Sequence, residues 1–216
     1  MTTRARTVSV VVLCAMRLAV PASLTARDQG EVIELRVMTY ASDPSNVQRA
    51  GQVALDVLGA AGLHALWRIC DAGPGGCVPS PDATRSVLVR LLPLSRVSDG
   101  SVAGETVKDQ VTGGAAILVY LGSEQALTRS FQQMAEGRSN PALASLSWGD
   151  LAGLTIAHEI GHVLGVPHSK AGLMKPRWDA ADIMAAHDSR LVFQRKESVA
   201  MAVALRSDNV TLALAR

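Results

Sequence analysis

Residues 158–168 read HEIGHVLGVPH and hold three of the five histidines in the 216-residue chain. His158 and His162 are four positions apart, so on a helix their side chains lie on one face and can bind a single metal ion. If the helix ends at Gly165, the chain can turn back so that His168 binds the same ion. Three neutral imidazoles leave the fourth position of a tetrahedral zinc ion open for water, as in catalytic rather than structural zinc sites.

Glu159 directly follows the first histidine and can reach a water on the metal without binding the metal itself. Zinc lowers the pKa of such a water from ~16 to ~7. Glu159 would accept the proton of that water as a general base. The alternative is a coincidence of surface histidines, but the pattern extended to Gly165 and His168 arises by chance in about one chain in a hundred thousand.

Ser147, with Asp150 three residues later, resembles a capping box that opens the helix carrying this pattern. Upstream, apolar–polar alternation and short apolar runs predict strands over residues 31–40, 63–70, 86–92, 105–111 and 115–121. The last of these runs is continuously apolar, as expected for a strand buried on both faces. Helical spacing predicts one helix from Asp43 to about Gly59 and a closing helix beyond residue 192. We therefore predict an α/β (α+β) fold with a mostly parallel twisted sheet, an active-site helix and a C-terminal helix.

These residues resemble the metzincin metalloproteases. Residues 158–168 match the H-E-x-x-H-x-x-G-x-x-H zinc motif of that family, and Ala171–Pro176 is similar to its Met-turn, with Met174 beneath the metal. Ser169 is the residue type that marks the matrixin branch. The resemblance covers about residues 30–207 and implies a metzincin-like zincin fold. It also implies that an extended substrate lies along the antiparallel edge strand, here within residues 101–111.

The sequence departs from the patterns of the metzincin branches in three places. Met174 follows His168 by six positions, a shorter connection than matrixins have. The histidine and aspartate cluster of the matrixin structural zinc has no counterpart, because His64 is the one histidine before the motif. The extra tyrosine ligand of astacins and serralysins is absent too, since Tyr40 and Tyr120 both precede the motif.

Other candidate residues outside the motif carry weaker signals. Met184 competes with Met174 for the Met-turn position, but it lies in a helical stretch and is expected in the core. His187 is a lone histidine in a polar setting and is expected at the surface. No Ser-His-Asp arrangement and no Gly-rich phosphate loop is readable, so the zinc motif carries the chemistry.

Residues 1–26 have the order of a secretory signal peptide, with Arg4 and Arg6 before the apolar stretch Val8–Met16. Cleavage is expected between about residues 23 and 27, which leaves residues 27–216 as the metalloprotease domain. A buried N-terminal strand or helix is the alternative. A stable membrane insertion is not expected, because the apolar stretch is well short of the ~20 residues that span a bilayer.

Cysteine usage agrees with export, since Cys14 leaves with the signal and Cys70 and Cys77 remain. Their close spacing around a turn-forming segment favours a disulfide in an oxidising compartment. Two free buried thiols are the alternative, and a zinc pair is disfavoured by the spacing. The segment Cys77–Asp82 also faintly resembles the cysteine switch of matrixin propeptides, although it lies between predicted strands rather than before the first.

Composition excludes several classes of protein. With 48% hydrophobic and 19% charged residues, the chain is neither disordered nor a coiled coil. Without residues 1–26 it carries 18 basic and 19 acidic side chains, a net charge of −1. A near-neutral chain with no basic run has no electrostatic footprint for nucleic acid.

We therefore expect a secreted zinc-dependent endopeptidase, extracellular or periplasmic, acting on a protein or peptide substrate. One catalytic Zn²⁺ would be bound by His158, His162 and His168, with Glu159 as general base. Two alternatives stay open. One is a non-catalytic zinc-binding or adhesion module of the same fold, which the presence of Glu159 disfavours, and the other is a zinc hydrolase of a non-protein amide. A calcium requirement and the oligomeric state stay open as well.

Overall fold

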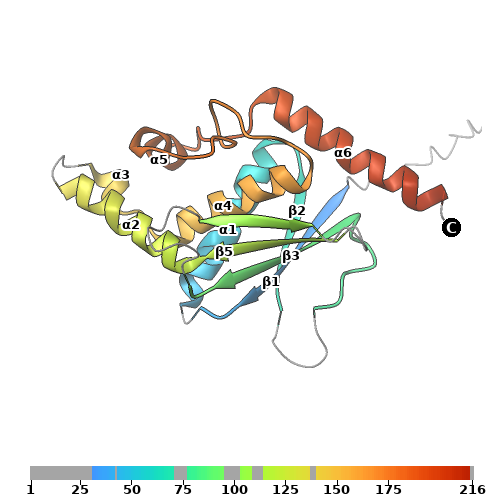
Figure 1. Cartoon of the computed structure of the whole chain (residues 1–216), viewed down its shortest axis with the longest axis horizontal. Helices are drawn as coiled ribbons and strands as arrows, with labels where there is room; N and C mark the ends of the chain where they lie inside the picture. The colour runs from blue at the N-terminus through green and yellow to red at the C-terminus, as the bar shows by residue number, and fades with distance from the viewer. Residues whose placement is uncertain are drawn as a thin grey trace, which may run out of the picture.

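The computed structural model (Figure 1) describes residues 31–41, 43–70, 77–94, 103–108, 114–136 and 140–214, with side chains up to residue 207. The predicted signal peptide, residues 1–26, lies outside these residues. So do residues 109–111 of the predicted fourth strand.

A five-stranded sheet forms the centre of the fold, in the order β2-β1-β3-β5-β4. Its strands are β1 (Val32–Thr39), β2 (His64–Ile69), β3 (Arg85–Leu92), β4 (Gly104–Lys108) and β5 (Ala115–Tyr120). Neighbouring strands are parallel except for β4, which runs antiparallel to β5 at one edge. The predicted fold class, a mixed α/β domain with a mostly parallel sheet, an active-site helix and a C-terminal helix, is confirmed.

The helices are α1 (Pro44–Ala60), α2 (Leu121–Glu136), α3 (Pro141–Ala144), α4 (Trp148–Val163), α5 (Ala180–His187) and α6 (Arg195–Leu214). The start of α4 has the predicted capping box, with Ser147 and Asp150 each bonded to the other's backbone N–H. Helix α2 is absent from the sequence prediction, although Leu127, Phe131 and Ala135 recur at four-residue spacing within it. Within the described residues, none of the helices combines the length and the apolar character needed to cross a bilayer.

Helices α1 and α4 pack against each other and cover one face of the sheet, and Figure 1 shows α4 between the sheet and the segment with α5 and α6. The covered face is buried at the centre of the sheet, as at Ile117 and Val119. On the other face, Ala116 and Leu118 remain partly exposed. The expectation that this strand is buried on both faces is therefore wrong, because the packed helices lie on one side of the sheet.

Small residues set how closely the two covering helices approach. A Cβ atom on Gly153 of α4 would lie 2.6 Å from Cβ of Val53 and 2.7 Å from the carbonyl oxygen of Ala50, both in α1. The second of these neighbours is backbone and cannot move aside. Glycine at position 153 is therefore a packing requirement of this helix pair.

On the open face of the sheet, residues 77–80 are tied to a buried carboxylate. Glu34 is 3% exposed and accepts hydrogen bonds from Arg68 (3.1 Å) and from the backbone N–H of Ser80 (2.8 Å). Burial raises the pKa of Glu34, but these hydrogen bonds outweigh it and the pKa is lowered. Cys70 and Cys77 are joined in the structure, with Cα atoms 5.3 Å apart, a separation that suits a disulfide. A disulfide between them, like the export of the chain, stays a prediction.

Replacing Gly153 with alanine is expected to lower the free energy of unfolding by about 1–3 kcal/mol, because the added methyl group overpacks the contact between α1 and α4. Gly59 is the matched control, since a Cβ atom there meets nothing within 4 Å. Gly59→Ala should raise the free energy of unfolding by about 0.5–1 kcal/mol through the helix propensity of alanine. Urea unfolding monitored by circular dichroism measures both changes. Equal effects of the two substitutions would contradict this account of the helix contact.

Candidate metal centre

Helix α4 and the turn after it bring the three motif histidines together as predicted. His158 and His162 lie one helical turn apart on α4. The helix ends where Gly165 adopts a φ of +84°, and the N–H of Val166 donates to the carbonyl oxygen of Gly161 at 2.8 Å. The chain then reverses and places His168 beside His162.

The ring nitrogens of these histidines converge on one point. Nε2 of His162 lies 3.1 Å from Nε2 of His158 and 3.1 Å from Nε2 of His168. Among the described residues, these three side chains are the group that could hold a metal ion, with ligand atoms all within 4.8 Å of one another. A tetrahedral zinc ion with Zn–N distances of about 2.0–2.1 Å separates its nitrogens by about 3.3 Å. The observed spacing therefore suits such an ion.

Backbone carbonyls fix which nitrogen faces inward in two of the three rings. Nδ1 of His158 lies 2.8 Å from the carbonyl oxygen of Leu173, and Nδ1 of His162 lies 2.8 Å from that of Val166. A carbonyl can only accept, so each Nδ1 carries the proton and each Nε2 presents a lone pair. Lone pairs facing one another at 3.1 Å repel unless a cation lies among them. The donor set therefore fits a divalent metal of the zinc type.

Electrostatics keep the buried histidine neutral. Burial, together with the charges of His162 and His168, lowers the pKa of His158 to about 4. Burial also lowers the pKa of His168, with a further contribution from His162. Neutral imidazole is the form that binds a metal, so these shifts favour metal binding at neutral pH.

Met174 and Trp178 pack against the histidines from the segment that follows them. Met174 is fully buried, and a Cβ atom on Gly161 would lie 2.6 Å from its sulfur, so glycine at position 161 makes room for the methionine. Met174 therefore packs against α4 at Gly161, and its predicted place beneath the metal stays a prediction. The Trp178 ring meets the His158 ring edge-on at a centroid distance of 5.7 Å, and its Nε1–H donates to the Leu173 carbonyl oxygen at 3.1 Å.

The 171–173 segment, which supplies that carbonyl, is itself held by residues before α6. The N–H of Leu173 donates to the carbonyl oxygen of Val192 at 3.0 Å, and the side-chain amide of Gln194 donates to that of Ala171 at 2.7 Å. Gly172 lies between them with a φ of +75°, and a Cβ atom there would meet the Val192 oxygen at 2.8 Å. The orientation of His158 therefore depends on residues more than thirty positions further along the chain.

Glu159 lies beside the histidines and is held by strand β4. The hydroxyl of Thr106 donates to Glu159 Oε2 at 2.7 Å and is 3.1 Å from the Glu159 carbonyl oxygen. Burial raises the pKa of Glu159, while the Thr106 hydrogen bond and the neighbouring His162 act in the opposite direction. Sequence reasoning missed Thr106 and Trp178. Thr106 falls within the predicted edge strand, but nothing in its sequence neighbourhood marks it.

A cavity of about 920 Å³ contains this group of side chains. Its lining is partly exposed along β4 and residues 175–178, which we call the rim. It is buried at Glu124, Phe131, Leu151 and Thr155, from α2 and the first half of α4, which we call the inner end. Cys77 is not among the lining residues, so the described structure does not bring it to the histidines as a cysteine switch would. Glu124 of α2, which sequence reasoning also missed, is 1% exposed at the inner end, and burial raises its pKa to about 8.

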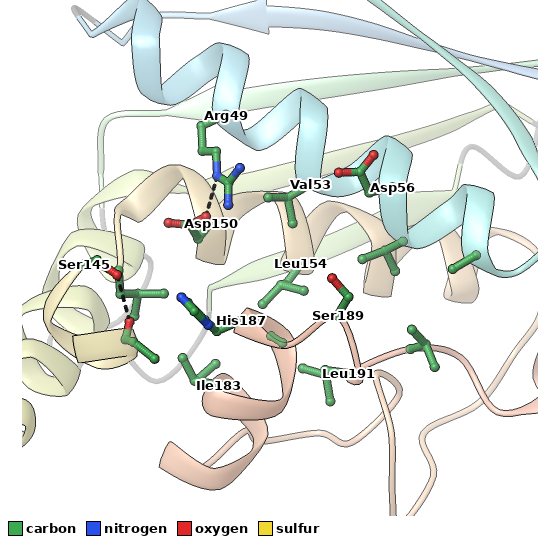
Figure 2. A pocket seen from close by; sticks show the side chains of 16 residues that line it. Arg49, Val53, Asp56, Ser145, Asp150, Leu154, Ile183, His187, Ser189 and Leu191 are labelled. Carbon is green, nitrogen blue, oxygen red and sulfur yellow. Dashed lines mark hydrogen bonds and ion pairs between the residues drawn. The ribbon is translucent and has the colours of Figure 1, made fainter. Parts of the chain in front are cut away.

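A second pocket of about 270 Å³, drawn in Figure 2, lies between α1, α4 and α5. Arg49 points at Asp150 across it, with N and O atoms 2.6 Å apart. His187 borders this pocket with a side chain that is 54% exposed, so its expected surface position is confirmed. Met184 packs against the core as expected. No metal-binding group forms there among the described residues.

No protein-family model matches the chain, and no curated protein matches it either. Among solved structures, the chain is similar to the crystal structure of archaemetzincin from Methanopyrus kandleri. The two are 13% identical, with a TM-score of 0.45, over 82% of this chain and 98% of that chain.

Replacing His162 with alanine should abolish stoichiometric zinc binding, because this ring is within 3.1 Å of both other candidate ligands. His187→Ala is the matched control, since it removes a histidine that lies outside the group. Metal analysis of both purified variants measures the difference. One zinc per chain in the His162→Ala protein would overturn the ligand assignment.

The buried carboxyl of Glu124 predicts a pH dependence of stability. Between the ordinary glutamate pKa of about 4.5 and the raised value of about 8, the unfolded chain loses this proton while the folded chain keeps it. The free energy of unfolding should therefore fall as pH rises through this window, on the order of 1 kcal/mol per pH unit from this group. Glu124→Gln removes that slope, so its advantage in melting temperature over the wild type should grow from pH 5 to pH 8. A difference in melting temperature that does not change with pH would contradict the assignment.

Proposed function

We propose that this chain is a secreted zinc-dependent endopeptidase. The observation that carries the proposal is the convergence of Nε2 of His158, His162 and His168, with Glu159 beside them in one cavity. Export rests on residues 1–26, which have the composition of a signal peptide. Under this proposal, residues 27–216 form the catalytic domain.

Zinc, when bound, supplies Lewis-acid chemistry and makes water acidic enough to react at neutral pH. The chain supplies the geometry around it. The Leu173 and Val166 carbonyl oxygens hold two imidazole rings in the required tautomer before any metal arrives, which reduces the reorganisation that binding requires. The third ring, His168, is exposed and lies at the mouth of the site.

Glu159 acts as the general base. Its Oε2 accepts the hydrogen bond of Thr106, so the carboxylate is oriented while its other oxygen is available to take a proton from water. Glu159 then returns the proton to the leaving amine. Thr106 is a positioning residue, since it touches the base rather than the reacting atoms.

The substrate we propose is an extended peptide. No described strand pairs with the outer edge of β4, and this edge borders the cavity that contains the histidines. A peptide can add to such an edge through backbone hydrogen bonds. Its scissile bond would then lie over the group formed by the histidines and Glu159. This supports cleavage within a chain rather than at its end.

The matrixin branch remains a prediction that rests on Ser169, which in the structure donates to the carbonyl oxygen of Ala171 at 2.7 Å.

Of the two alternatives, the zinc-binding module is disfavoured by the orientation of Glu159, because a binding module has no use for an oriented base. The hydrolase of a non-protein amide uses the same residues, and assay of cell-wall fragments beside casein separates it from a protease.

Replacing Glu159 with alanine should leave the zinc content and the fold nearly intact and reduce casein cleavage by on the order of a hundred- to ten-thousandfold. The reason is that Glu159 is beside the ligands but does not belong to the ligand group. Glu136, exposed at the end of α2, gives the matched control variant Glu136→Ala. Zinc content and initial rates are measured on the same preparations.

Two outcomes would count against the proposal. Full activity of zinc-loaded Glu159→Ala protein would show that another group takes the proton. A zinc-loaded wild type that cleaves neither casein nor any member of a peptide library would favour the binding module.

A further inference from the structure

The inner end of the cavity beside the histidines is apolar except for one carboxyl group and the threonine hydroxyl that donates to it. Leu127 and Phe131 of α2 and Leu151 of α4 line it, together with Glu124 and Thr155. Glu124, Leu127 and Phe131 are spaced i, i+3 and i+7, so they lie on one face of α2. This end begins one helical turn before His158, because Thr155 precedes it by three residues.

Glu124 has only half of the hydrogen bonding that a buried carboxyl group requires. Its Oε1 accepts a hydrogen bond from the Thr155 hydroxyl at 2.7 Å. Its Oε2 is buried and has no partner among the described residues. Protonation at Oε1 would let the carboxyl donate to the Thr155 hydroxyl, but Oε2 would still be a buried oxygen without a donor among the described residues. Buried groups of this kind are uncommon and frequently functional.

Among the described residues, no positively charged side chain pairs with Glu124. The influences on its pKa are burial, which raises it, and the Thr155 hydrogen bond, which lowers it, with no contribution from a cation. Lys175, at the rim of the cavity, donates instead to Asp179 and Asp182. The carboxyl group also does not cap its own helix, since no described backbone N–H donates to it.

We propose that this inner end is a specificity site, in which Glu124 receives a substrate side chain that is aliphatic along its length and ends in a cation, lysine or arginine. The inference rests on the proposed peptidase function for the identity of the substrate. The aliphatic part contacts Leu127, Phe131 and Leu151, and the cation pairs with Oε2 of Glu124.

Other occupants match the lining less well. A leucine side chain would fill the apolar wall and leave Oε2 without a partner. A glutamine would supply a hydrogen bond but no charge, and charge-assisted hydrogen bonds are about twice as strong as neutral ones. An acidic side chain would bring a second carboxyl group into the same buried site, where burial disfavours the ionised form of both. The raised pKa of Glu124, about 8, agrees with this assignment, because the empty site is neutral and an arriving cation favours the ionised carboxylate.

The first experiment measures cleavage by the zinc-loaded wild type of peptides that differ at one residue beside the scissile bond, varied on each side in turn. The residues are lysine, arginine, glutamine, norleucine and glutamate. Norleucine is the matched substrate, since it keeps the aliphatic part of lysine and lacks the ammonium group. We expect kcat/KM for the lysine or arginine peptide to exceed that for norleucine by about tenfold or more on one side of the bond. Glu124→Gln should remove that ratio, and Glu136→Gln, on the exposed end of the same helix, should keep it.

The second experiment separates this inference from the proposed function. The zinc-loaded Glu159→Ala protein binds peptides without cleaving them, and Trp178 in the cavity lining reports binding by fluorescence. We expect the lysine peptide to bind about tenfold more tightly than the norleucine peptide, and a second change, Glu124→Gln, to remove the difference. A wild type that cleaves nothing while this difference persists would overturn the peptidase proposal and leave the specificity site standing.

The inference is overturned if lysine and norleucine peptides bind and react equally, or if their ratio survives Glu124→Gln. Circular dichroism and zinc content establish that the variant folds. If the Glu124→Gln variant does not fold, the pKa of Glu124 can be measured in the protein without that substitution. Carbon NMR of Glu124 should show a lower pKa with the lysine peptide than with norleucine, and an equal pKa would refute the contact.

Discussion

The packing of α4 on all sides is the constraint on which the rest of the molecule depends. Small residues permit it at each contact, with Gly153 against α1, Gly161 against Met174, and Gly104 of β4 against Thr155. A helix held in this way has little freedom to rotate or slide. Because His158, Glu159 and His162 all lie on it, the rigidity of the core is passed directly to the candidate metal centre.

Two of the three histidine rings, His158 and His162, are oriented by hydrogen bonds to backbone atoms rather than to side chains. Their acceptors are the carbonyl oxygens of Val166, in the turn after α4, and of Leu173, beyond His168. Carboxylates often play this part around zinc and would add negative charge to the site. Neutral carbonyls orient these two rings without adding negative charge beside the ligand nitrogens.

Much of the fold and of the candidate metal centre could be predicted from local sequence. The capping box at Ser147, the i, i+4 histidines and the apolar alternation of the strands are properties of short windows, and all of them recur in the structure. Helix α2 was missed because its helical spacing is diluted by polar residues such as Gln132 and Gln133. A second reason applies to side chains whose contacts are with residues far away in the sequence.

Thr106 and Glu124 illustrate that second reason. Thr106 is 53 positions from Glu159, and Glu124 is 31 positions from its partner Thr155. Neither has a local pattern, since a threonine on a strand and a glutamate in the first turn of a helix are common. Their roles arise only when β4, α2 and α4 meet at one cavity. The zinc motif alone therefore does not predict which distant residues line the cavity.

The hydrogen bonds that hold the 171–173 segment to Val192 and Gln194 have a consequence for protein engineering. The eleven residues 158–168 contain all three candidate metal ligands, so the segment could be taken for a unit that can be transferred to another protein. The segment is not sufficient, because the carbonyl oxygen that orients His158 belongs to Leu173. Leu173 is in turn hydrogen-bonded to Val192, just before α6. Grafting the motif onto a foreign helix would transfer the histidines without the backbone that aims them. The smallest transplantable unit runs from β4, which orients Glu159, to the start of α6.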